Sequence, residues 1–387
     1  RMLFPIGPVG VFSASNFPYA FAVAGGDTAS AFAAGCPVIV KGHPGHPATS
    51  EWFAHAINRA IARLGFPAGF FSLLQGDQVA VGQGLVTHPG VAAIAFTGSL
   101  RAGRAIFDAA SQRPTPIPVY AEMGSINPVC ILPGALAERG EALAGELVTS
   151  VTLGAGQFCT NPGLVLVQDG PAAQEFIAAV TARMDEARPG VLLNANIAQG
   201  LQRAVATTLA EPDVTRLAGG EVVSGTPFCY ANTVMQTTSA AFRANPAMQQ
   251  EHFGPVTLFV LCASADDMAA TVDALHGNLT ATVHASDAEI ASAGQLFDRL
   301  REKAGRLLWN GFPTGVEVVH AMQHGGPYPA TTAPATTSVG MTAIKRFLRP
   351  VAFQNMPDAL LPDALKDANP RGIWRRVDEV WTRDPIG

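Results

Sequence analysis

The first third of the chain alternates short runs of apolar residues with longer segments in which apolar residues recur at helical spacing. The longer segments predict helices at 24–35, 49–65, 77–86 and 100–112. The short runs predict strands at 9–15, 37–41, 70–74, 91–96 and 117–124. Strict alternation of strand and helix predicts right-handed βαβ units, in which a parallel sheet carries helices on both faces.

The same alternation returns with longer helices after residue 125. Helices are predicted at 138–153, 171–187, 196–210, 264–275 and 287–304. Strands are predicted at 128–132, 163–168, 256–261, 280–285 and 306–309. After Gly311 the chain is rich in Gly, Pro and Thr, and it then reaches a late apolar strand at 349–356 and a polar tail. A second α/β domain is therefore expected to follow the first.

Composition narrows the class of protein. Of 387 residues, 48% are hydrophobic and 14% are charged, which favours a well-buried globular chain over a disordered one. The net charge of -5 provides no basic surface, so nucleic acid is not an expected partner. No apolar run approaches the roughly 18 residues that a membrane span needs, so no membrane partner is expected.

Cysteine usage indicates a reducing compartment. The five cysteines, at 36, 130, 159, 229 and 262, are odd in number and show no CxxC spacing. This pattern argues against a disulfide framework and against a zinc site. We therefore expect a cytoplasmic protein with no metal.

One of these cysteines has unusual neighbours. Cys159 lies in the stretch TLGAGQFCTNPGL, among glycines and small polar residues. A buried cysteine normally has apolar neighbours, and the ordinary interpretation is that Cys159 packs in the core. Gly154, Gly156 and Gly163 instead indicate a backbone that turns sharply or lets another molecule approach.

A nucleotide-phosphate site has only a weak local signal. The sequence contains neither GxGxxG nor GxxxxGK[ST]. It does contain FTGS, with Gly98 and Ser99 between a predicted strand and a predicted helix. Backbone N–H groups at such a helix start suit a phosphate, although Ser99 as an ordinary N-cap explains the pattern equally well.

Four further polar residues sit at strand ends or rigid turns. They are Asn16 before Phe-Pro, Lys41 and Glu122 at the ends of buried strands, and Glu251 before Phe-Gly-Pro. Each has an ordinary explanation as a turn residue or a surface boundary. A functional alternative is that the carboxyl ends of parallel strands meet at a ligand site, where burial raises the pKa of a carboxylate toward that of a useful base.

The order of these motifs resembles the aldehyde dehydrogenase superfamily over essentially the whole chain. The matching stretches are SNFP, VIVKGHP, FTGS, AEMGSINP, GAGQFCT and EHFGP. The stretches AGGDTASAFAAGCPVIVKGHPGHP and HGGPYPATT resemble most closely one branch, the NADP-dependent 2,5-dioxovalerate (α-ketoglutaric semialdehyde) dehydrogenases. NADP-dependent fatty-aldehyde dehydrogenases are a related branch.

The resemblance implies roles for three residues. Cys159 would be the nucleophile that attacks the aldehyde carbon, for which a lowered thiol pKa and an open approach are expected. The Asn16 amide and the Cys159 backbone N–H would hold the oxyanion. Glu122 would activate water to release the acid from a thioester on Cys159.

The resemblance also implies a dinucleotide cofactor. Its nicotinamide end would meet Glu251 and Phe253, and its adenosine ribose and pyrophosphate would meet Lys41, Gly98 and Ser99. NAD-preferring relatives carry a glutamate where this chain has Pro44. Loss of a carboxylate that repels a 2′-phosphate favours NADP, with NAD as the alternative. His43 and His46 would lie near that phosphate, or simply in a loop.

The expected partner is a small aldehyde, and several side chains are expected to contact it. Phe158 and Phe312 are predicted to line its tunnel. A substrate carboxylate would need a cation, for which the candidates are Arg243, Arg346 and Arg349, and the spacing does not choose among them. Alternatives are a fatty aldehyde or another semialdehyde, a CoA-acylating reaction that Glu122 disfavours, and an inactive truncated nucleotide-binding scaffold.

The implied fold class is α/β with a Rossmann-like dinucleotide-binding domain at 1–124, incomplete at its N-terminus. A catalytic domain would span 125–343, and an oligomerisation strand and tail would span 344–387. Family members normally carry a further segment before GPVGVF, which contributes to oligomer formation. The resemblance also makes the strand around Val351 an intersubunit edge, predicting a homodimer or homotetramer.

Overall fold

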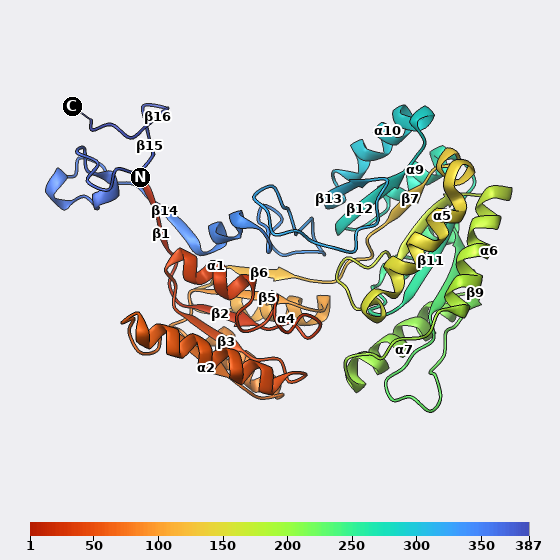
Figure 1. Cartoon of the computed structure of the whole chain (residues 1–387), viewed down its shortest axis with the longest axis horizontal. Helices are drawn as coiled ribbons and strands as arrows, with labels where there is room; N and C mark the ends of the chain where they lie inside the picture. The colour runs from red at the N-terminus through yellow and green to blue at the C-terminus, as the bar shows by residue number, and fades with distance from the viewer. Residues whose placement is uncertain (387) are drawn as a thin grey trace.

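The computed structural model describes residues 1–386 and contains two separate parallel-sheet units placed side by side (Figure 1). The first is a five-stranded sheet in the order β4-β3-β2-β5-β6. Its strands are β2 (Val9–Phe12), β3 (Val38–Lys41), β4 (Phe71–Leu74), β5 (Ala93–Thr97) and β6 (Val119–Glu122). The intervening helices are α1 (Gly26–Ala34), α2 (Pro47–Arg63), α3 (Val79–Thr87) and α4 (Leu100–Ser111). All neighbouring strands in this sheet are parallel, as the alternation predicts.

The helices cover both faces of the first sheet because its strands are apolar on both faces. Val9, Val11 and Val38 pack with α1 and α2 on one face, where Phe347 also joins the core. Ile94 packs with α3 and α4 on the opposite face. Burial on both sides is typical of a parallel sheet and accounts for the continuous apolar runs in the sequence.

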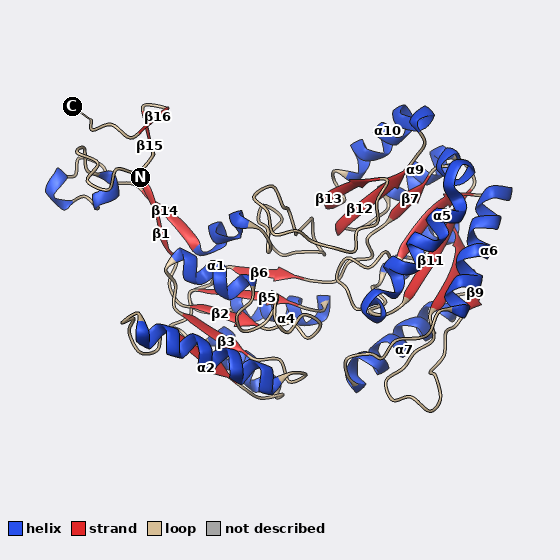
Figure 2. Ribbon diagram, viewed as in Figure 1, coloured by secondary structure: helices blue, strands red, loops and turns tan. Residues whose placement is uncertain are grey.

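The second unit is a seven-stranded sheet in the order β13-β12-β7-β8-β11-β10-β9. Its strands are β7 (Val129–Ile131), β8 (Leu164–Gln168), β9 (Thr215–Ala218), β10 (Thr233–Thr238), β11 (Val256–Cys262), β12 (Asn278–His284) and β13 (Ala304–Trp309). Its helices are α5 (Pro133–Thr152), α6 (Pro171–Glu186), α7 (Ala195–Leu209), α8 (Ser239–Ala244), α9 (Ala265–Asp273) and α10 (Ile290–Leu300). Only β9 runs antiparallel, at one edge. Figure 2 shows this sheet enclosed by helices.

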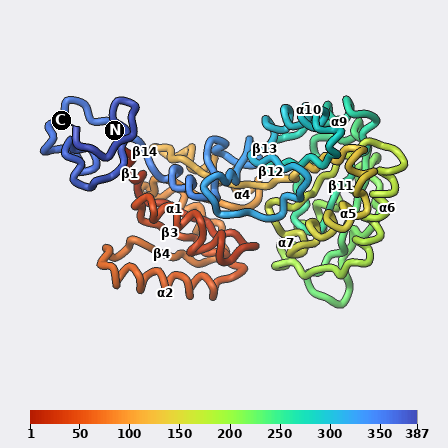
Figure 3. Tube along the Cα trace, turned by 45° about the horizontal axis from the view of Figure 1, so that its top comes forward, coloured from red at the N-terminus to blue at the C-terminus, as the bar shows by residue number. Residues whose placement is uncertain are grey.

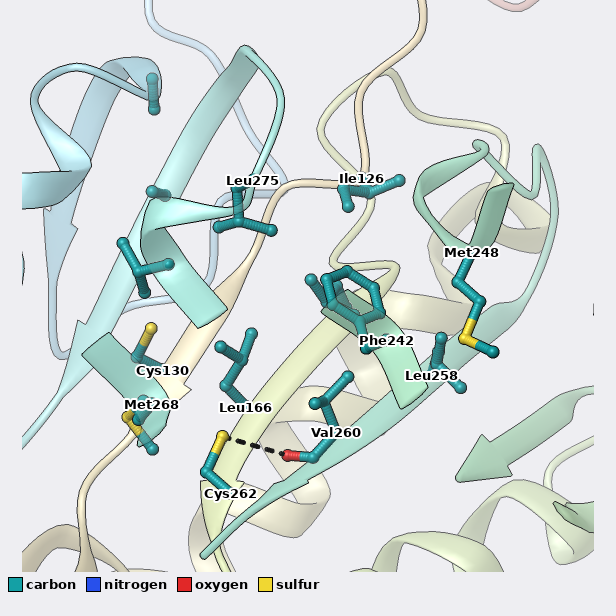
Figure 4. Close-up of a cluster of buried hydrophobic side chains, with 14 of the residues drawn as sticks. Ile126, Cys130, Leu166, Phe242, Met248, Leu258, Val260, Cys262, Met268 and Leu275 are labelled. Carbon is teal, nitrogen blue, oxygen red and sulfur yellow. Dashed lines mark hydrogen bonds between the residues drawn. The ribbon is translucent and has the colours of Figure 1, made fainter. Parts of the chain in front are cut away.

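Side chains of the second sheet alternate between two hydrophobic cores. Leu164 and Leu166 of β8 face the core formed with α7–α10, whereas Val165 and Val167 face α5 and α6. Figure 4 shows the first of these cores, where Phe242 of α8 lies among strand side chains. The alternation places the side chains of the central strands in two apolar layers, so the middle of the sheet is a rigid base for the loops at its ends.

After β13 the chain returns to the first sheet. Met123 N donates to Ala330 O at 2.7 Å, and Thr331 forms a bridge to Glu122. The 3-10 segment Met341–Phe347 then packs against α1. Residues 330–347 therefore lie with the first sheet, whereas the predicted boundary at 343 assigns most of them to the second domain. The sequence signal for such a return is absent because the segment has no periodicity.

The late strand pairs within the chain. β14 is shorter than the predicted 349–356 and spans Leu348–Val351, and it pairs antiparallel with β1 (Met2–Pro5). This two-stranded ribbon leads away from both sheets to the C-terminal tail (Figure 3). The tail carries β15 (Arg375–Val377) and β16 (Val380–Thr382), which pair antiparallel. Pro350 removes one backbone donor from β14, as is typical of an edge strand.

No helix within residues 1–386 is both long enough and apolar enough to cross a lipid bilayer.

Candidate active site

A cleft opens where the strand order of the first sheet reverses. The chain passes outward from β2 to β3 and β4 and then returns to place β5 on the other side of β2. In parallel sheets this reversal point leaves a crevice beyond the carboxyl ends of the strands, where ligands bind. The cleft there has a volume of about 1050 Å³. The residues predicted from sequence that line it are Asn16, Lys41, Gly98, Ser99, Glu122, Cys159, Glu251 and Phe253.

The loop that carries Cys159 is held by close backbone packing. It follows α5 through the tight turn Leu153–Gly156. Gly156 has φ of +68°, and a Cβ there would lie 2.1 Å from the carbonyl carbon of Gly254. Only glycine fits this position, because the conformation is left-handed and the neighbour is backbone rather than a movable side chain. The GAGQFC stretch is thereby fixed against the EHFGP stretch.

A buried asparagine holds the backbone around Cys159. The Asn127 amide donates to the carbonyls of Cys159 at 2.9 Å and Asn161 at 2.8 Å. Asn127 is itself held by Asn278, whose side-chain oxygen accepts from the backbone N–H groups of Ile126 and Asn127. Asn278 begins β12, so the thiol is tied to the second sheet. The sequence analysis missed both asparagines, although Asn127 lies within the AEMGSINP motif.

A buried triad surrounds the thiol. His324 Nε2 lies 3.5 Å from Cys159 Sγ and 3.1 Å from Glu122 Oε1. Ser338 donates to the other oxygen of Glu122 at 2.5 Å. The side chains of Glu122 and His324 are 3% and 1% exposed, so this interaction is sheltered from water. His324 and Ser338 were also missed, although both lie at conspicuous positions in the HGGPYPATT–TSVG stretch.

The pKa shifts of Glu122 and Cys159 are opposite to those expected from the sequence, which were a raised pKa for the carboxylate and a lowered pKa for the thiol. Burial would raise the pKa of Glu122, but the charge of His324 and hydrogen bonds from His324, Ser338 and Cys159 together hold that pKa below its ordinary value. Burial and the charges of Glu122 and Glu251 raise the pKa of the Cys159 thiol well above its ordinary value. The thiol therefore keeps its proton beside two carboxylates, and the proton must leave before attack.

Glu251 forms a second carboxylate in the same region. Its side chain approaches the chain beside Gly124, where an added Cβ would lie 2.8 Å from Oε2. Burial raises the pKa of Glu251 to about 7, and the charge of Glu122 adds to the shift. Two nearby acids with separated pKa values are an arrangement that can both accept and donate a proton near neutral pH.

Three other predicted residues occupy different surroundings. The Asn16 amide donates to Gln157 O at 2.9 Å, two residues before the nucleophile. Phe158 packs edge-on against Phe17, with ring centroids 5.0 Å apart, and does not line the cleft. Phe312 packs on His284, with ring centroids 4.6 Å apart, and lines a separate surface cavity.

The far end of the cleft is built from short-range contacts. Lys41 Nζ donates to Gly42 O at 3.0 Å, and burial lowers the pKa of Lys41 while Asp77 opposes the shift. Ser99 caps α4 by accepting from Ala102 N. The helix start beyond Gly98 presents free backbone N–H groups to the cleft, as an anion site requires.

The two histidines of this region differ. His46 Nε2 lies 2.8 Å from Ala14 O and its Nδ1 lies 3.2 Å from Ser50 Oγ, so it braces the loop and does not line the cleft. His43 lines the cleft, but burial, His46 and Lys41 lower its pKa to about 4. It is therefore uncharged at neutral pH, whereas Lys41 and Arg101, which also line the cleft, carry positive charge.

None of the three candidate arginines lines the cleft. Arg243 pairs with Asp267 at 2.6 Å beside α9, and Arg346 pairs with Asp27 at 2.7 Å beneath α1. Arg349 lies in β14 on the ribbon. Because none of the three lines the cleft that contains Cys159, none is placed to contact a substrate held there.

Comparison with known proteins identifies the family. The model of the aldehyde dehydrogenase family matches residues 2–330. An alpha-ketoglutaric semialdehyde dehydrogenase 2 of Azospirillum brasilense is 51% identical over 96% of this chain and 71% of its own length. An alpha-ketoglutaric semialdehyde dehydrogenase of Acinetobacter baylyi is 44% identical over 98% of this chain and 72% of its own length. The chain therefore belongs to the aldehyde dehydrogenase family, whose members oxidise aldehydes, and the resemblance found in the sequence is confirmed.

Solved structures confirm the fold. A glyceraldehyde-3-phosphate dehydrogenase of Methanocaldococcus jannaschii, complexed with NADP, has a TM-score of 0.72 at 21% identity and covers 90% of this chain and 72% of its own. A betaine aldehyde dehydrogenase of Staphylococcus aureus, in complex with NAD+, has a TM-score of 0.76 at 20% identity and covers 92% of this chain and 71% of its own. The expected aldehyde dehydrogenase fold is thus confirmed.

Proposed function

We propose that this protein oxidises α-ketoglutaric semialdehyde to 2-oxoglutarate, with a nicotinamide dinucleotide as the oxidant and a thioester on Cys159 as the intermediate. The observation that carries the reaction type is the contact of Cys159 Sγ with His324 beside Glu122 at the inner end of the cleft. The observation that carries the substrate is the 51% and 44% identity to enzymes named for that semialdehyde.

The first chemical step requires a thiolate at Cys159. Because the thiol pKa is raised, its proton must pass to a neighbouring base as the aldehyde approaches. The Glu122 carboxylate lies within hydrogen-bond reach of that proton, whereas His324 Nε2 donates its own proton to Glu122 and cannot accept a second one. The Sγ–carbon bond then forms, and the Cys159 backbone N–H and the free Asn16 amide hydrogen stabilise the oxyanion.

The second step releases the acid. Glu122 has a lowered pKa and is therefore ionised, so it can accept a proton from water that attacks the thioester carbon. The thiol is regenerated as the acid leaves. His324 and Ser338 fix the orientation of the Glu122 carboxylate, so both are positioning residues for this step.

The chain has residues that fit the dinucleotide. One continuous cleft wall leads to Cys159. It is formed by the point where the strand order reverses, by the capped start of α4 and by Lys41. When bound, the nicotinamide accepts the hydride that leaves the aldehyde carbon. Glu251 and Phe253 would hold the nicotinamide end, and Lys41, Gly98 and Ser99 would hold the ribose and pyrophosphate.

NADP is the preferred cofactor in this proposal. Pro44 lines the cleft where a glutamate would repel a 2′-phosphate, and Lys41 lies three positions earlier. Neutral His43 adds a hydrogen-bonding group but no charge. A positive Lys41 without an opposing glutamate favours the dianionic phosphate, and NAD remains acceptable because nothing in this wall excludes it sterically.

The same proposal covers assembly and location. We propose a homodimer or homotetramer formed through the β1–β14 ribbon and the tail, where Trp374 and Trp381 are 64% and 67% exposed. Such exposed aromatic side chains suit an interface. The five cysteines are free, which fits a reducing cytoplasm. Light scattering measures the assembly, and a monomer would contradict it.

An aldehyde panel tests the substrate and the cofactor together. Purified protein is given 2,5-dioxopentanoate, glutarate semialdehyde or a fatty aldehyde, each with NADP or NAD, and formation of the reduced nicotinamide is followed. The expected result is the highest kcat/KM for 2,5-dioxopentanoate with NADP, with the free acid as the product whether or not coenzyme A is present. Preference for a fatty aldehyde, or a CoA-dependent product, would overturn the proposal.

A further inference from the structure

Three different metal-binding side chains converge beside the cleft. A sulfur of Cys159, a ring nitrogen of His324 and a carboxylate oxygen of Glu122 all lie within 4.8 Å of one another. They come from the nucleophile loop, from the returning segment after β13 and from the end of β6. This distance along the chain is the reason that cysteine and histidine spacing in the sequence indicates no metal site.

The separations match those of ligands around one tetrahedral zinc ion. Zinc binds thiolate sulfur at about 2.3 Å and nitrogen or oxygen at about 2.0–2.1 Å, so tetrahedral angles place sulfur about 3.5 Å from nitrogen and nitrogen about 3.3 Å from oxygen. The observed separations are 3.5 Å for Sγ to Nε2 and 3.1 Å for Nε2 to Oε1. Both separations thus fit one tetrahedral ion, and the third separation, between Sγ and the carboxylate oxygen, lies within 4.8 Å.

The surroundings also suit a cation. The Glu122 carboxylate is ionised and Glu251 adds negative charge near the thiol. Ser338 donates to the second oxygen of Glu122 and so fixes the direction of the first, as partners of ligating groups do in metal sites. Cys159 and Glu122 line the cleft, which provides an entry path and leaves a fourth position open.

We propose that Cys159, His324 and Glu122 form an inhibitory site for Zn²⁺ or another divalent ion of similar softness. Binding releases the thiol proton to solvent and moves the His324 ring proton from Nε2 to Nδ1, which has no hydrogen-bond partner. A Zn–S bond, a Zn–N bond and a Zn–O bond form, with no change of oxidation state. The ion occupies the nucleophile and the base at once, so turnover stops until the ion is removed. The inference concerns the resting protein and does not depend on which aldehyde is the substrate.

Direct binding is the first test. The full chain is titrated with Zn²⁺ alone against a chromophoric chelator, and one ion per chain is expected. Co²⁺ in place of Zn²⁺ should give a thiolate-to-cobalt charge-transfer band and the intense visible bands of a tetrahedral ion. Absence of one-to-one binding, or a cobalt spectrum without the charge-transfer band, would overturn the proposal.

Variants assign the ligands. Cys159→Ser, His324→Ala and Glu122→Gln should each weaken Zn²⁺ binding by more than the roughly 10–100-fold that loss of an outer partner costs. His324→Cys keeps a ligand at that position and should bind more tightly than His324→Ala. Matched controls are His320→Ala, an exposed histidine, and Cys229→Ser, a buried cysteine away from the cleft. Equal affinity in His324→Ala and His320→Ala would contradict the assignment.

Inhibition is the second readout. Zn²⁺ should inhibit the parent reversibly and in competition with aldehyde, and a chelator should restore the full rate. His320→Ala and Cys229→Ser should keep the parental sensitivity. If the parent binds Zn²⁺ but oxidises no aldehyde, the proposed function fails while the metal site stands. If it oxidises aldehyde and is insensitive to Zn²⁺, the metal site fails alone.

Discussion

The two ends of the cleft differ in how far apart along the chain their contacting residues lie. At the end formed by the first sheet, Lys41 bonds to its neighbour Gly42, and Ser99 bonds three residues ahead within its own helix start. At the thiol end, Glu122 contacts His324 and Ser338, which are 202 and 216 positions away along the chain. Contacts between residues that are close in sequence leave the cleft wall able to adjust locally to a ligand. Contacts between residues that are far apart in sequence hold the side chains in one arrangement.

The largest expected effect tests whether the thiol end performs the chemistry. Cys159→Ser should lower kcat by several orders of magnitude, because a serine hydroxyl is a far weaker nucleophile than a cysteine thiolate. Formation of the reduced nicotinamide measures it. Cys229→Ser is the control, since Cys229 is buried away from the cleft, where its Sγ donates to the backbone carbonyls of Pro189 and Gly190, and it should keep full activity. Substantial turnover by Cys159→Ser would remove the basis of the mechanism.

Matching glycine substitutions at the two ends should differ in cost. Gly156→Ala places a Cβ 2.1 Å from backbone atoms in a left-handed conformation and should lower the free energy of unfolding by about 4 kcal/mol or more. Gly98→Ala places its Cβ against the Phe96 ring, a side chain that can move, and should cost less. Denaturant unfolding compares them. Equal costs would show that the two ends are equally rigid.

The hydrogen bonds that Asn278 accepts (here called the Asn278 clamp) allow the effect of positioning Cys159 to be distinguished from a general effect on stability. Asn278→Ala leaves the backbone N–H groups of Ile126 and Asn127 without their acceptor, at about 1–3 kcal/mol for each buried group. Both the free energy of unfolding and kcat should fall.

Asn232→Ala is the matched control for this clamp. Asn232 is also buried and bonds to the carbonyls of Met184 and Ala187, away from the cleft. Its substitution should lower stability while kcat stays near the parental value. Parallel losses of kcat in both variants would mean that the clamp has no specific effect on the thiol.

The smallest expected effect is a pH dependence of stability from Glu251. Its pKa is raised from 4.5 to about 7 by folding, so the unfolded chain holds this proton less tightly, and stability contributed by this group falls as pH rises from about 4.5 to about 7. Glu251→Gln should therefore gain in Tm relative to the parent between about pH 5 and pH 8. Exposed Glu302→Gln should show no such trend, and a flat difference for Glu251→Gln would refute the shift.

The contrast in scale also explains what the sequence can predict. Strand and helix positions in both sheets follow local periodicity, and most predicted elements are present with shifted ends. Strands β9 and β10 were not predicted because Thr, Arg and Gln interrupt their apolar runs, and α8 was not predicted because its 6 residues are too few to show helical periodicity. The return of residues 330–347 to the first sheet depends on contacts between distant segments, which periodicity does not encode.

The same limit applies to the site. Eight of ten predicted residues line the cleft, because ordered motifs carry them. His324, Ser338, Asn127 and Asn278 were missed because their importance comes from partners that are far away along the chain. The raised pKa of the thiol was missed for the same reason, since it needs two carboxylates brought beside it by folding.

The link from Asn278 to the nucleophile loop has a consequence for motion. Because β12 lies between β7 and β13 inside the larger sheet, the backbone that supports the thiol moves only when that sheet opens. The amide protons of Ile126 and Asn127 should then exchange with solvent as slowly as the most protected strands. If the cleft widens to admit an aldehyde, we therefore expect the movement on the other side of the cleft, in the loops that follow β2 and β3.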